Sequence, residues 1–324
     1  MEISNDNFDA WISQDPGDNE YTTHLVFRTR NNNHLGEVIS DKLRVTAGKW
    51  SVDVTVKQDN SAVYSGRFVN VLTVSSIGDL GVDMVSSDAS GLAMRKVLDV
   101  NFAPAGTIRI GGFSYTRIPN TSGYVGTSNS DNLAVLKRIF GTQDVIYFPY
   151  DVNISSAVAD LLLEWLDASP NRVLFMGMDT DATNKNLRLK PRIANEGTFG
   201  FSSISTVTTN YITASKSEAA KDFFEGPFGT VQEGAAINRA DNIAGYIMNY
   251  SNDVIPLITS DKAGYEGYVF FSLNPANRII YHGDAQLFQT SQMSNNNGNI
   301  TSEADKLMAN TWAWIIEQVI YGAD

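Results

Sequence analysis

Four polar residues stand where apolar runs end, and their types could do chemistry. Asp179 and Asp181 follow the apolar run at residues 173–176, and His282 and Asp284 stand at the end of another. A carboxylate facing an imidazole can transfer protons, and two carboxylates two residues apart can hold a hard cation. We therefore take Asp179, His282 and Asp284 as candidate catalytic residues and Asp181 as a candidate ligand-binding residue. The structural alternative is that the carboxylates cap turns while His282 packs at a strand end.

A metal site built on these residues is not expected. Counted from Asp179, the calcium-loop pattern requires Gly at position 184 and Glu at position 190, where this chain has Asn and Lys. The chain has three histidines, and we expect His24 and His34 to lie in an N-terminal sheet, away from His282. The sequence thus predicts no resident metal.

A third candidate site is the loop at residues 75–81, which follows the apolar run at residues 69–74. Its hydroxyls and glycines could cradle a phosphate, as in flavin-binding relatives of this topology, so Ser75 and Gly78 are candidate ligand-binding residues. The loop matches neither the Walker spacing nor G-x-G-x-x-G, and Asp79 would repel an anion. We expect no nucleotide cofactor, and a plain connecting loop is the alternative.

Several chemistries are excluded or disfavoured by what the chain lacks. It has no cysteine, which excludes thiol nucleophiles, zinc–thiolate sites, iron–sulfur clusters and disulfides. It has no G-x-S-x-G motif for a serine hydrolase. The 324 residues carry a net charge of −12, which disfavours nucleic acid and anionic membranes as partners. No apolar run is long enough to span a membrane.

The elements that would position these residues follow from hydrophobic periodicity. Residues 21–68 alternate apolar and polar side chains, which predicts antiparallel strands. From residue 69 onward, continuous apolar runs alternate with helical patterns, as in a parallel sheet covered on both faces. The predicted fold is α/β, with a doubly wound, mainly parallel sheet preceded by a small antiparallel β region. We place the domains at residues 1–68, a half-sandwich, and 69–324, with an insertion at about 182–262.

Individual segments can be assigned along the second domain. We expect strands at residues 69–74, 107–110, 145–148, 173–176, 267–273 and 278–282. We expect helices at residues 90–100, 131–140, 155–168 and 302–321. Arg188, Lys190 and Arg192 form a basic run at period two, which predicts one face of a strand.

Several short motifs occur in the order found in one known family. Gly177-Met178-Asp179 follows a strand, Glu225-Gly226-Pro227-Phe228-Gly229 comes later, and residues 277–288 precede a terminal helix that holds Asn310 and Trp314. From residue 69 to 324 the chain resembles the class I glutamine amidotransferase-like, flavodoxin-like fold. It is most similar to the non-catalytic branches seen in trehalose-utilisation-type proteins and in domains of bacterial surface proteins.

The departures from that family bear on activity. Members that release ammonia from glutamine use a Cys on a sharp turn together with a His and a Glu. The matching turn here, residues 176–179, has no thiol, and no Glu stands two residues beyond His282. The resemblance therefore implies the fold without glutamine amidotransferase activity.

Three functions are compatible with these observations. The first is a non-catalytic module of an exported bacterial protein, with a binding or assembly role toward carbohydrate or another surface protein. The second is a hydrolase or isomerase acting on a small sugar, with Asp179, His282 and Asp284 at the strand ends. The third is a purely structural part of a surface assembly. Export, to the periplasm or cell surface with the leader absent, is expected from the abundance of Asn, Ser and Thr. A cytoplasmic location is the alternative.

Overall fold

The structure is a computed structural model in which the chain divides into two compact units, residues 1–63 and 64–324. The residues that it describes are 8–13, 24–29, 38–47, 50–59, 64–75, 83–85, 89–149, 152, 154–177, 188–194, 198–203, 208–210, 218–232, 236–238, 243–250, 252–259, 263–264, 266–283, 288 and 297–322. Each unit is described by itself.

The first unit contains two antiparallel strand pairs. β1 (Phe8–Ser13) pairs with β2 (His24–Thr29), and β3 (Val38–Ala47) pairs with β4 (Trp50–Asp59). An antiparallel β region ahead of the α/β sheet is therefore confirmed. Residues 64–68, predicted to belong to it, instead begin a parallel strand of the second unit. Period-two alternation suits such strands because successive side chains point to opposite faces.

The second unit is built on one large sheet. Among the described residues it has nine strands, in the order β6-β5-β7-β8-β15-β14-β12-β9, with β13 also paired to β14. The parallel strands are β6 (Ile110–Ile118), β5 (Tyr64–Val74), β7 (Val145–Phe148), β8 (Val173–Gly177) and β15 (Ile279–His282). The antiparallel strands are β14 (Val269–Asn274), β12 (Ile243–Met248), β9 (Thr198–Ser203) and β13 (Ile255–Thr259). A short separate pair joins β10 (Thr208–Asn210) to β11 (Ala236–Asn238).

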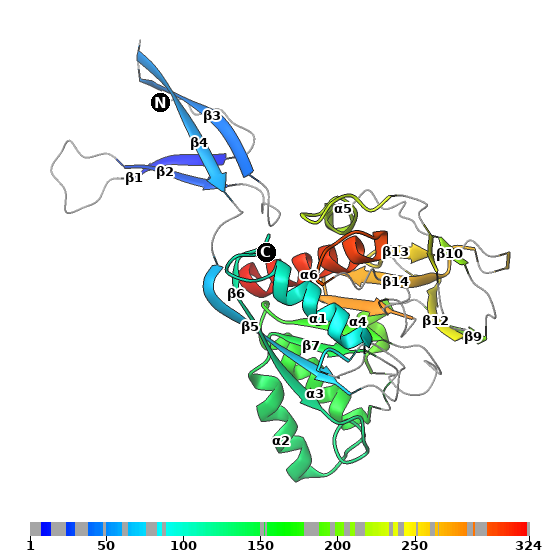
Figure 1. The fold of residues 1–324 in the computed structure, drawn as a ribbon. Helices are drawn as coiled ribbons and strands as arrows, with labels where there is room; N and C mark the ends of the chain where they lie inside the picture. The colour runs from blue at the N-terminus through cyan, green and yellow to red at the C-terminus, as the bar shows by residue number, and fades with distance from the viewer. Residues whose placement is uncertain are drawn as a thin grey trace. The chain divides into compact units, whose positions relative to one another are not determined.

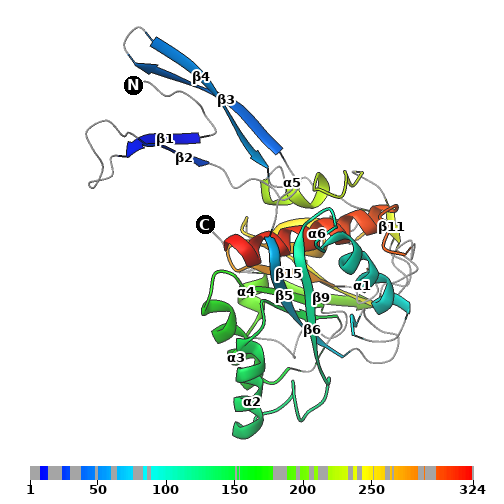
Figure 2. The same cartoon turned by 60° about the vertical axis from the view of Figure 1, so that its left-hand side comes forward.

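Helices cover both faces of this sheet, which confirms the doubly wound α/β fold (Figures 1 and 2). One face carries α1 (Ala89–Asn101), α5 (Glu218–Phe224) and α6 (Glu303–Tyr321). The other carries α2 (Ser130–Gly141), α3 (Ser156–Asp167) and α4 (Lys190–Ala194). The chain winds away from β5 in opposite directions through β6 and β7. The carboxyl ends of β5 and β7 therefore form the topological switch point, where open α/β sheets bind ligands.

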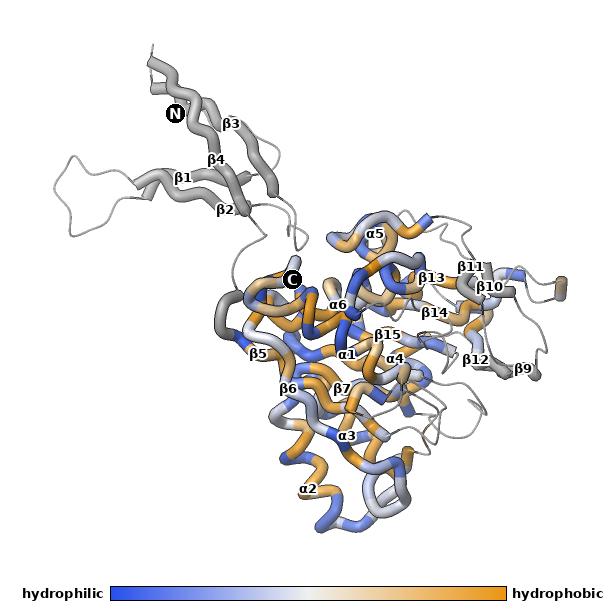
Figure 3. Tube along the Cα trace, viewed as in Figure 1, coloured by the Kyte–Doolittle hydropathy of each residue, from blue (hydrophilic) through white to orange (hydrophobic). Residues whose placement is uncertain are grey.

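Helix α3 shows how the sequence sets an element. Ser155 is the N-cap, and its hydroxyl accepts a hydrogen bond from the Val158 backbone N–H at 3.1 Å. Leu162 and Trp165 lie on the buried stripe, in the core that α2 and α3 form with the sheet. Helix α2 lies at the outside of this layer and alternates hydrophilic and hydrophobic residues along its turns (Figure 3).

Two predicted strands are corrected by the structure. The strand predicted at residues 107–110 is instead β6, at Ile110–Ile118, an edge strand with mixed polar residues that lacks a continuous apolar run. The basic run at residues 188–192 is not a strand face, because it leads into helix α4. There Arg188 pairs with Asp160 at 2.7 Å and Arg192 pairs with Asp167 at 2.6 Å, so both arginines bind the carboxylates of α3.

Candidate functional site

The carboxyl ends of β5, β7, β8 and β15 lie along one edge of the sheet. The register pairs Thr73 with Tyr147 and Gly177 with His282. Of the residues proposed from the sequence, His282 and Ser75 lie at this edge. The remaining four, Asp179, Asp181, Asp284 and Gly78, lie outside the described residues, so their place at the site stays a prediction.

His282 is packed into the strand ends with only 1% of its surface exposed. Its ring meets that of Phe175 edge-on, with centroids 5.4 Å apart. A Cβ on Gly177 would lie 2.6 Å from the imidazole Cε1 and 2.9 Å from the carbonyl oxygen of Phe148. The imidazole thus fills the space that a side chain at position 177 would need, which explains the glycine there. A site role for His282 stays a prediction.

Gly283, which follows His282 in the sequence, stands where two backbone segments approach each other closely. A Cβ on Gly283 would lie 1.7 Å from the carbonyl oxygen of Gly245 in β12. The Gly245 N–H donates to the Gly283 carbonyl at 2.7 Å, and the Gly283 N–H donates to the Phe270 carbonyl at 2.7 Å. Only glycine permits two backbones to approach so closely.

Ser75 joins the loops that follow β5 and β6. Its hydroxyl accepts a hydrogen bond from the Asn120 backbone N–H at 2.8 Å, and its own N–H donates to the Ile118 carbonyl at 2.9 Å. The side-chain amide nitrogen of Asn120 is buried there with no hydrogen-bond partner in the described structure. The ligand-binding role proposed for Ser75 stays a prediction, and these contacts give the residue a structural role.

An ion pair that no sequence motif indicates lies at the same edge. Arg117, on β6, contacts Asp83 through both Nε and Nη2, each 2.8 Å from Oδ2. The other carboxylate oxygen accepts the Val85 N–H at 3.1 Å. The Asp83 side chain is fully buried, while that of Arg117 is 46% exposed. The pair therefore joins a buried negative charge to a positive charge that reaches solvent.

Thr73 stands beside Arg117 and Tyr147 in the sheet register, completing what we call the strand-end cluster: Thr73, Asp83, Arg117 and Tyr147. The Thr73 side chain is fully buried, and its hydroxyl has no hydrogen-bond partner in the part of the chain that the structure describes. Leaving a buried hydroxyl unpaired costs about 1–3 kcal/mol. Such groups in native proteins call for an explanation, and a ligand or ordered water is one.

Tyr147 gives the cluster a proton donor. Burial raises the pKa of the Tyr147 phenol, and the negative charge of Asp83 raises it further. The phenol therefore keeps its proton and can donate a hydrogen bond. Hydroxyls at Thr73 and Tyr147, next to an ion pair without net charge, can bind polar groups but supply no activated nucleophile.

Segment 225–229, which is part of the sequence resemblance, is held by hydrogen bonds to Asn310 of the terminal helix α6. Asn310, which is fully buried, accepts the Phe228 N–H at 3.0 Å and donates to the carbonyls of Phe223 and Gly229, both at 3.1 Å. A Cβ on Gly226 would lie 2.6 Å from the Asn310 side chain. Two parts of the sequence resemblance, 225–229 and Asn310, thus meet as a structural support.

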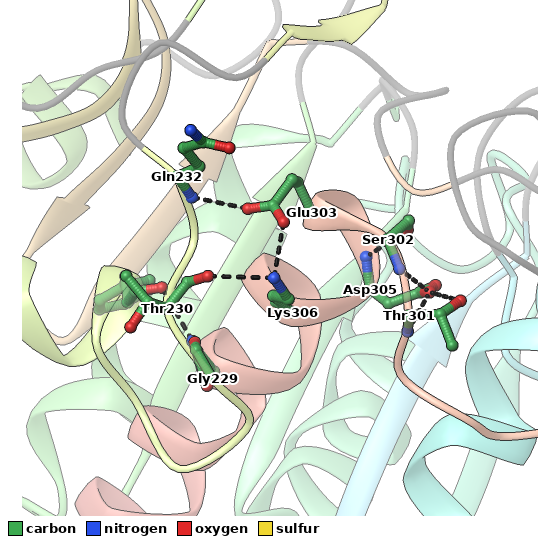
Figure 4. A network of polar contacts seen from close by, with 10 residues as sticks. Gly229, Thr230, Gln232, Thr301, Ser302, Glu303, Asp305 and Lys306 are labelled. Carbon is green, nitrogen blue, oxygen red and sulfur yellow. Dashed lines mark hydrogen bonds and ion pairs between the residues drawn. The ribbon is translucent and has the colours of Figure 1, made fainter.

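A charged network at the start of α6 extends this support (Figure 4). Glu303 accepts the Gln232 backbone N–H at 2.6 Å, and Lys306 donates to Glu303 at 2.6 Å and to the Thr230 carbonyl at 3.2 Å. Burial alone would raise the pKa of Glu303, but the hydrogen bonds from Lys306 and Gln232 outweigh it, so the pKa lies below its usual value. The network fastens the loop after α5 to α6.

Two negative findings apply to the described residues. No group of three or more His, Cys, Asp and Glu side chains there is arranged to hold a metal ion. No helix among them is long and apolar enough to cross a membrane.

Comparisons with known proteins found similarity to solved structures alone. No family model and no curated protein matches the chain. A putative ThuA-like protein from Bacteroides uniformis is 11% identical, with a TM-score of 0.47 over 79% of this chain and 94% of that one. A cytoplasmic protein from Salmonella typhimurium is 11% identical, with a TM-score of 0.42 over 86% of this chain and 96% of that one. Because both TM-scores are below 0.5, we base the functional proposal on the residues of this chain.

Proposed function

We propose that the α/β domain, which the sequence places at residues 69–324 with an insertion at about 182–262, is a non-catalytic, amidotransferase-like binding module. Its ligand is a small neutral carbohydrate, held by the strand-end cluster. The observation that carries this proposal is the buried hydroxyl of Thr73, which has no partner in the described structure at the topological switch point.

The charges of the cluster favour a neutral ligand. Arg117 and Asp83 neutralise each other, so neither an anion nor a cation finds an unbalanced charge. A sugar hydroxyl can both donate to and accept from the Thr73 hydroxyl, and it can accept from the Tyr147 phenol. The exposed part of Arg117 leaves one member of the cluster within reach of solvent.

The absence of turnover is supported by two features. The chain has no cysteine for the thiol chemistry of active amidotransferases. The only histidine near the strand ends, among the described residues, is His282, whose ring is packed against Gly177 and Phe175 and is 1% exposed. A role as part of an exported bacterial protein is the remaining element of the proposal, supported by composition alone.

The test is calorimetric titration of the whole chain with a panel of neutral mono- and disaccharides, while proton NMR follows the sugar. We expect saturable binding, an unchanged sugar, and at least tenfold weaker binding by the variant Thr73→Val. The matched variant Thr311→Val, also fully buried but in α6, should bind as the wild type does. Conversion of a sugar would establish the enzymatic alternative, and binding that is absent or insensitive to Thr73→Val would refute the assignment of the site.

A further inference from the structure

A cavity of about 400 Å³ lies at the opposite, amino-terminal edge of the sheet. It is formed where the α2–β7 and α3–β8 connections meet the start of β5 and the end of α6. We call it the amino-edge cavity. The residues that line it include Arg67, Gln143, Asp144, Asn171, Arg172 and Ile320. Its volume is within the range of about 300–1,000 Å³ that small-molecule sites occupy. Its lining is nearly all polar, which suits a hydrophilic ligand.

Two lining residues are already bound to helix ends. Arg172 donates to the Trp165 carbonyl at 2.6 Å and lies over the Trp165 ring, 5.6 Å from its centroid. Asn171 donates to the Val319 carbonyl at 3.1 Å. Because these contacts satisfy the last carbonyls of α3 and α6, they are structural, and they hold the cavity wall in place.

Gln143 is the residue that points to a ligand. It is 6% exposed, and its amide nitrogen donates to the Ile139 carbonyl at 3.2 Å and to the Thr142 hydroxyl at 2.7 Å. These bonds assign the amide orientation and leave its oxygen buried with no hydrogen-bond partner in the described structure. An acceptor held this way is costly unless a donor reaches it.

Arg67 and Asp144 place complementary charges on the same cavity. Asp144 accepts the Asn70 backbone N–H at 2.8 Å, and its other oxygen is 3.5 Å from Arg67. The Arg67 side chain is 42% exposed, and this long ion pair uses one of its guanidinium nitrogens. Further N–H donors of Arg67 therefore remain for a ligand in the cavity, which Gln143 also lines.

We propose that the amino-edge cavity binds a small neutral polyol, at a site separate from the strand-end cluster. A hydroxyl can donate to the Gln143 oxygen while its neighbour accepts from Arg67, so one ligand satisfies both groups. An anion would gain Arg67 but approach the negative charge of Asp144, and a carboxylate would also leave the Gln143 oxygen unpaired. A cation would gain the two acceptors but meet two arginines. The mixed donors and acceptors therefore select an uncharged, hydroxyl-rich ligand.

The test is calorimetric titration of the whole chain carrying Thr73→Val, in which binding at the strand-end cluster is weakened at least tenfold. The probes are myo-inositol and glucose, with acetate and inorganic phosphate as anionic comparisons. We expect saturable binding of a polyol, weakened at least tenfold by Gln143→Leu and by Arg67→Gln. The control Arg188→Gln, an exposed arginine that pairs with Asp160 on α3, should leave affinity unchanged.

Three results would overturn this proposal: anions binding in place of polyols, polyol affinity insensitive to both variants, or no binding at millimolar concentrations. Urea unfolding of each variant verifies that it is folded. Arg67→Gln should fold normally, because Asp144 keeps its hydrogen bond from Asn70. The variants separate the two sites: binding at the strand-end cluster should be weakened by Thr73→Val and kept by Gln143→Leu, whereas binding at the amino-edge cavity should be kept by Thr73→Val and weakened by Gln143→Leu.

Discussion

Replacing Thr73 by valine tests the unpaired hydroxyl directly, because it exchanges the hydroxyl for a methyl group of similar size. The side chain is fully buried in β5, and its hydroxyl has no partner in the described structure. Burial of an unpaired hydroxyl costs about 1–3 kcal/mol, while an apolar group of the same shape costs nothing. Valine also suits a buried strand. We expect the ligand-free variant to be more stable by about 1 kcal/mol, the lower end of that range.

The assay is urea unfolding followed by circular dichroism, with thermal unfolding alongside it. For a domain of this size, 1 kcal/mol corresponds to an increase in Tm of roughly 2–4 °C. The slope of the free energy of unfolding against urea should not change, because the surface exposed on unfolding is unchanged. Together with lost carbohydrate binding, a stability gain would show that the hydroxyl is kept for ligand binding.

Thr311→Val is the matched comparison. Thr311 is equally buried, but its hydroxyl donates to the Leu307 carbonyl at 2.7 Å. Losing that bond should lower stability by about 0.5–1.5 kcal/mol. If Thr73→Val lowered stability as much as Thr311→Val, the Thr73 hydroxyl would have a partner in solution, and the reasoning for the site would fail.

Three further predictions concern the elements around the site. Gly177→Ala should lower the free energy of unfolding by about 1–3 kcal/mol, because the added methyl meets the His282 ring and a backbone oxygen. Gly141→Ala, whose methyl would meet no atom within 4 Å beyond its own helix and chain neighbours, should be neutral or stabilising. Urea unfolding of both variants checks this, and equal stabilities would contradict it. Asn310→Ala should lower the free energy of unfolding by about 3 kcal/mol and speed proteolysis at residues 225–229, because it removes three hydrogen bonds. An unchanged cleavage rate would show that Asn310 does not hold this segment in place. The pKa of Glu303 is lower in the folded state than its ordinary 4.5, so the stabilisation that it gives is fully present above pH 4.5 and is lost as the pH falls from 4.5 through the lowered pKa. In urea unfolding curves the stability difference between wild type and Glu303→Gln should therefore shrink below pH 4.5, and a difference independent of pH would refute this.

The fold could be predicted where local signals agree with burial. β7 and β8 are short apolar runs buried on both faces, and α3 begins with a serine cap and continues with an apolar stripe, so both types of element were identified. β6 was misplaced because an edge strand needs no continuous apolar run. The basic run at residues 188–192 was assigned to a strand because five residues are too few to separate period two from a helical turn.

The candidate site was less accessible to sequence reasoning. Thr73 could have been noticed, since it is the polar residue next to the end of an otherwise apolar stretch of β5. Asp83 and Arg117 could not, because no motif links them and they meet only through the pairing of β5 with β6 and the return of the chain from its loop. Pairs of this kind depend on tertiary structure.

The position of β15 in the middle of the sheet has a consequence for synthesis on the ribosome. Its neighbours are β8, from the middle of the chain, and β14, which directly precedes it. The hairpin of β14 and β15 is local and closes quickly, whereas docking onto β8 must await nearly complete translation. Until then the buried strand β8 has an uncovered edge, the kind of surface that promotes aggregation. A nascent chain cut short before residue 279 would keep that edge, so quality control of truncated products matters for this protein.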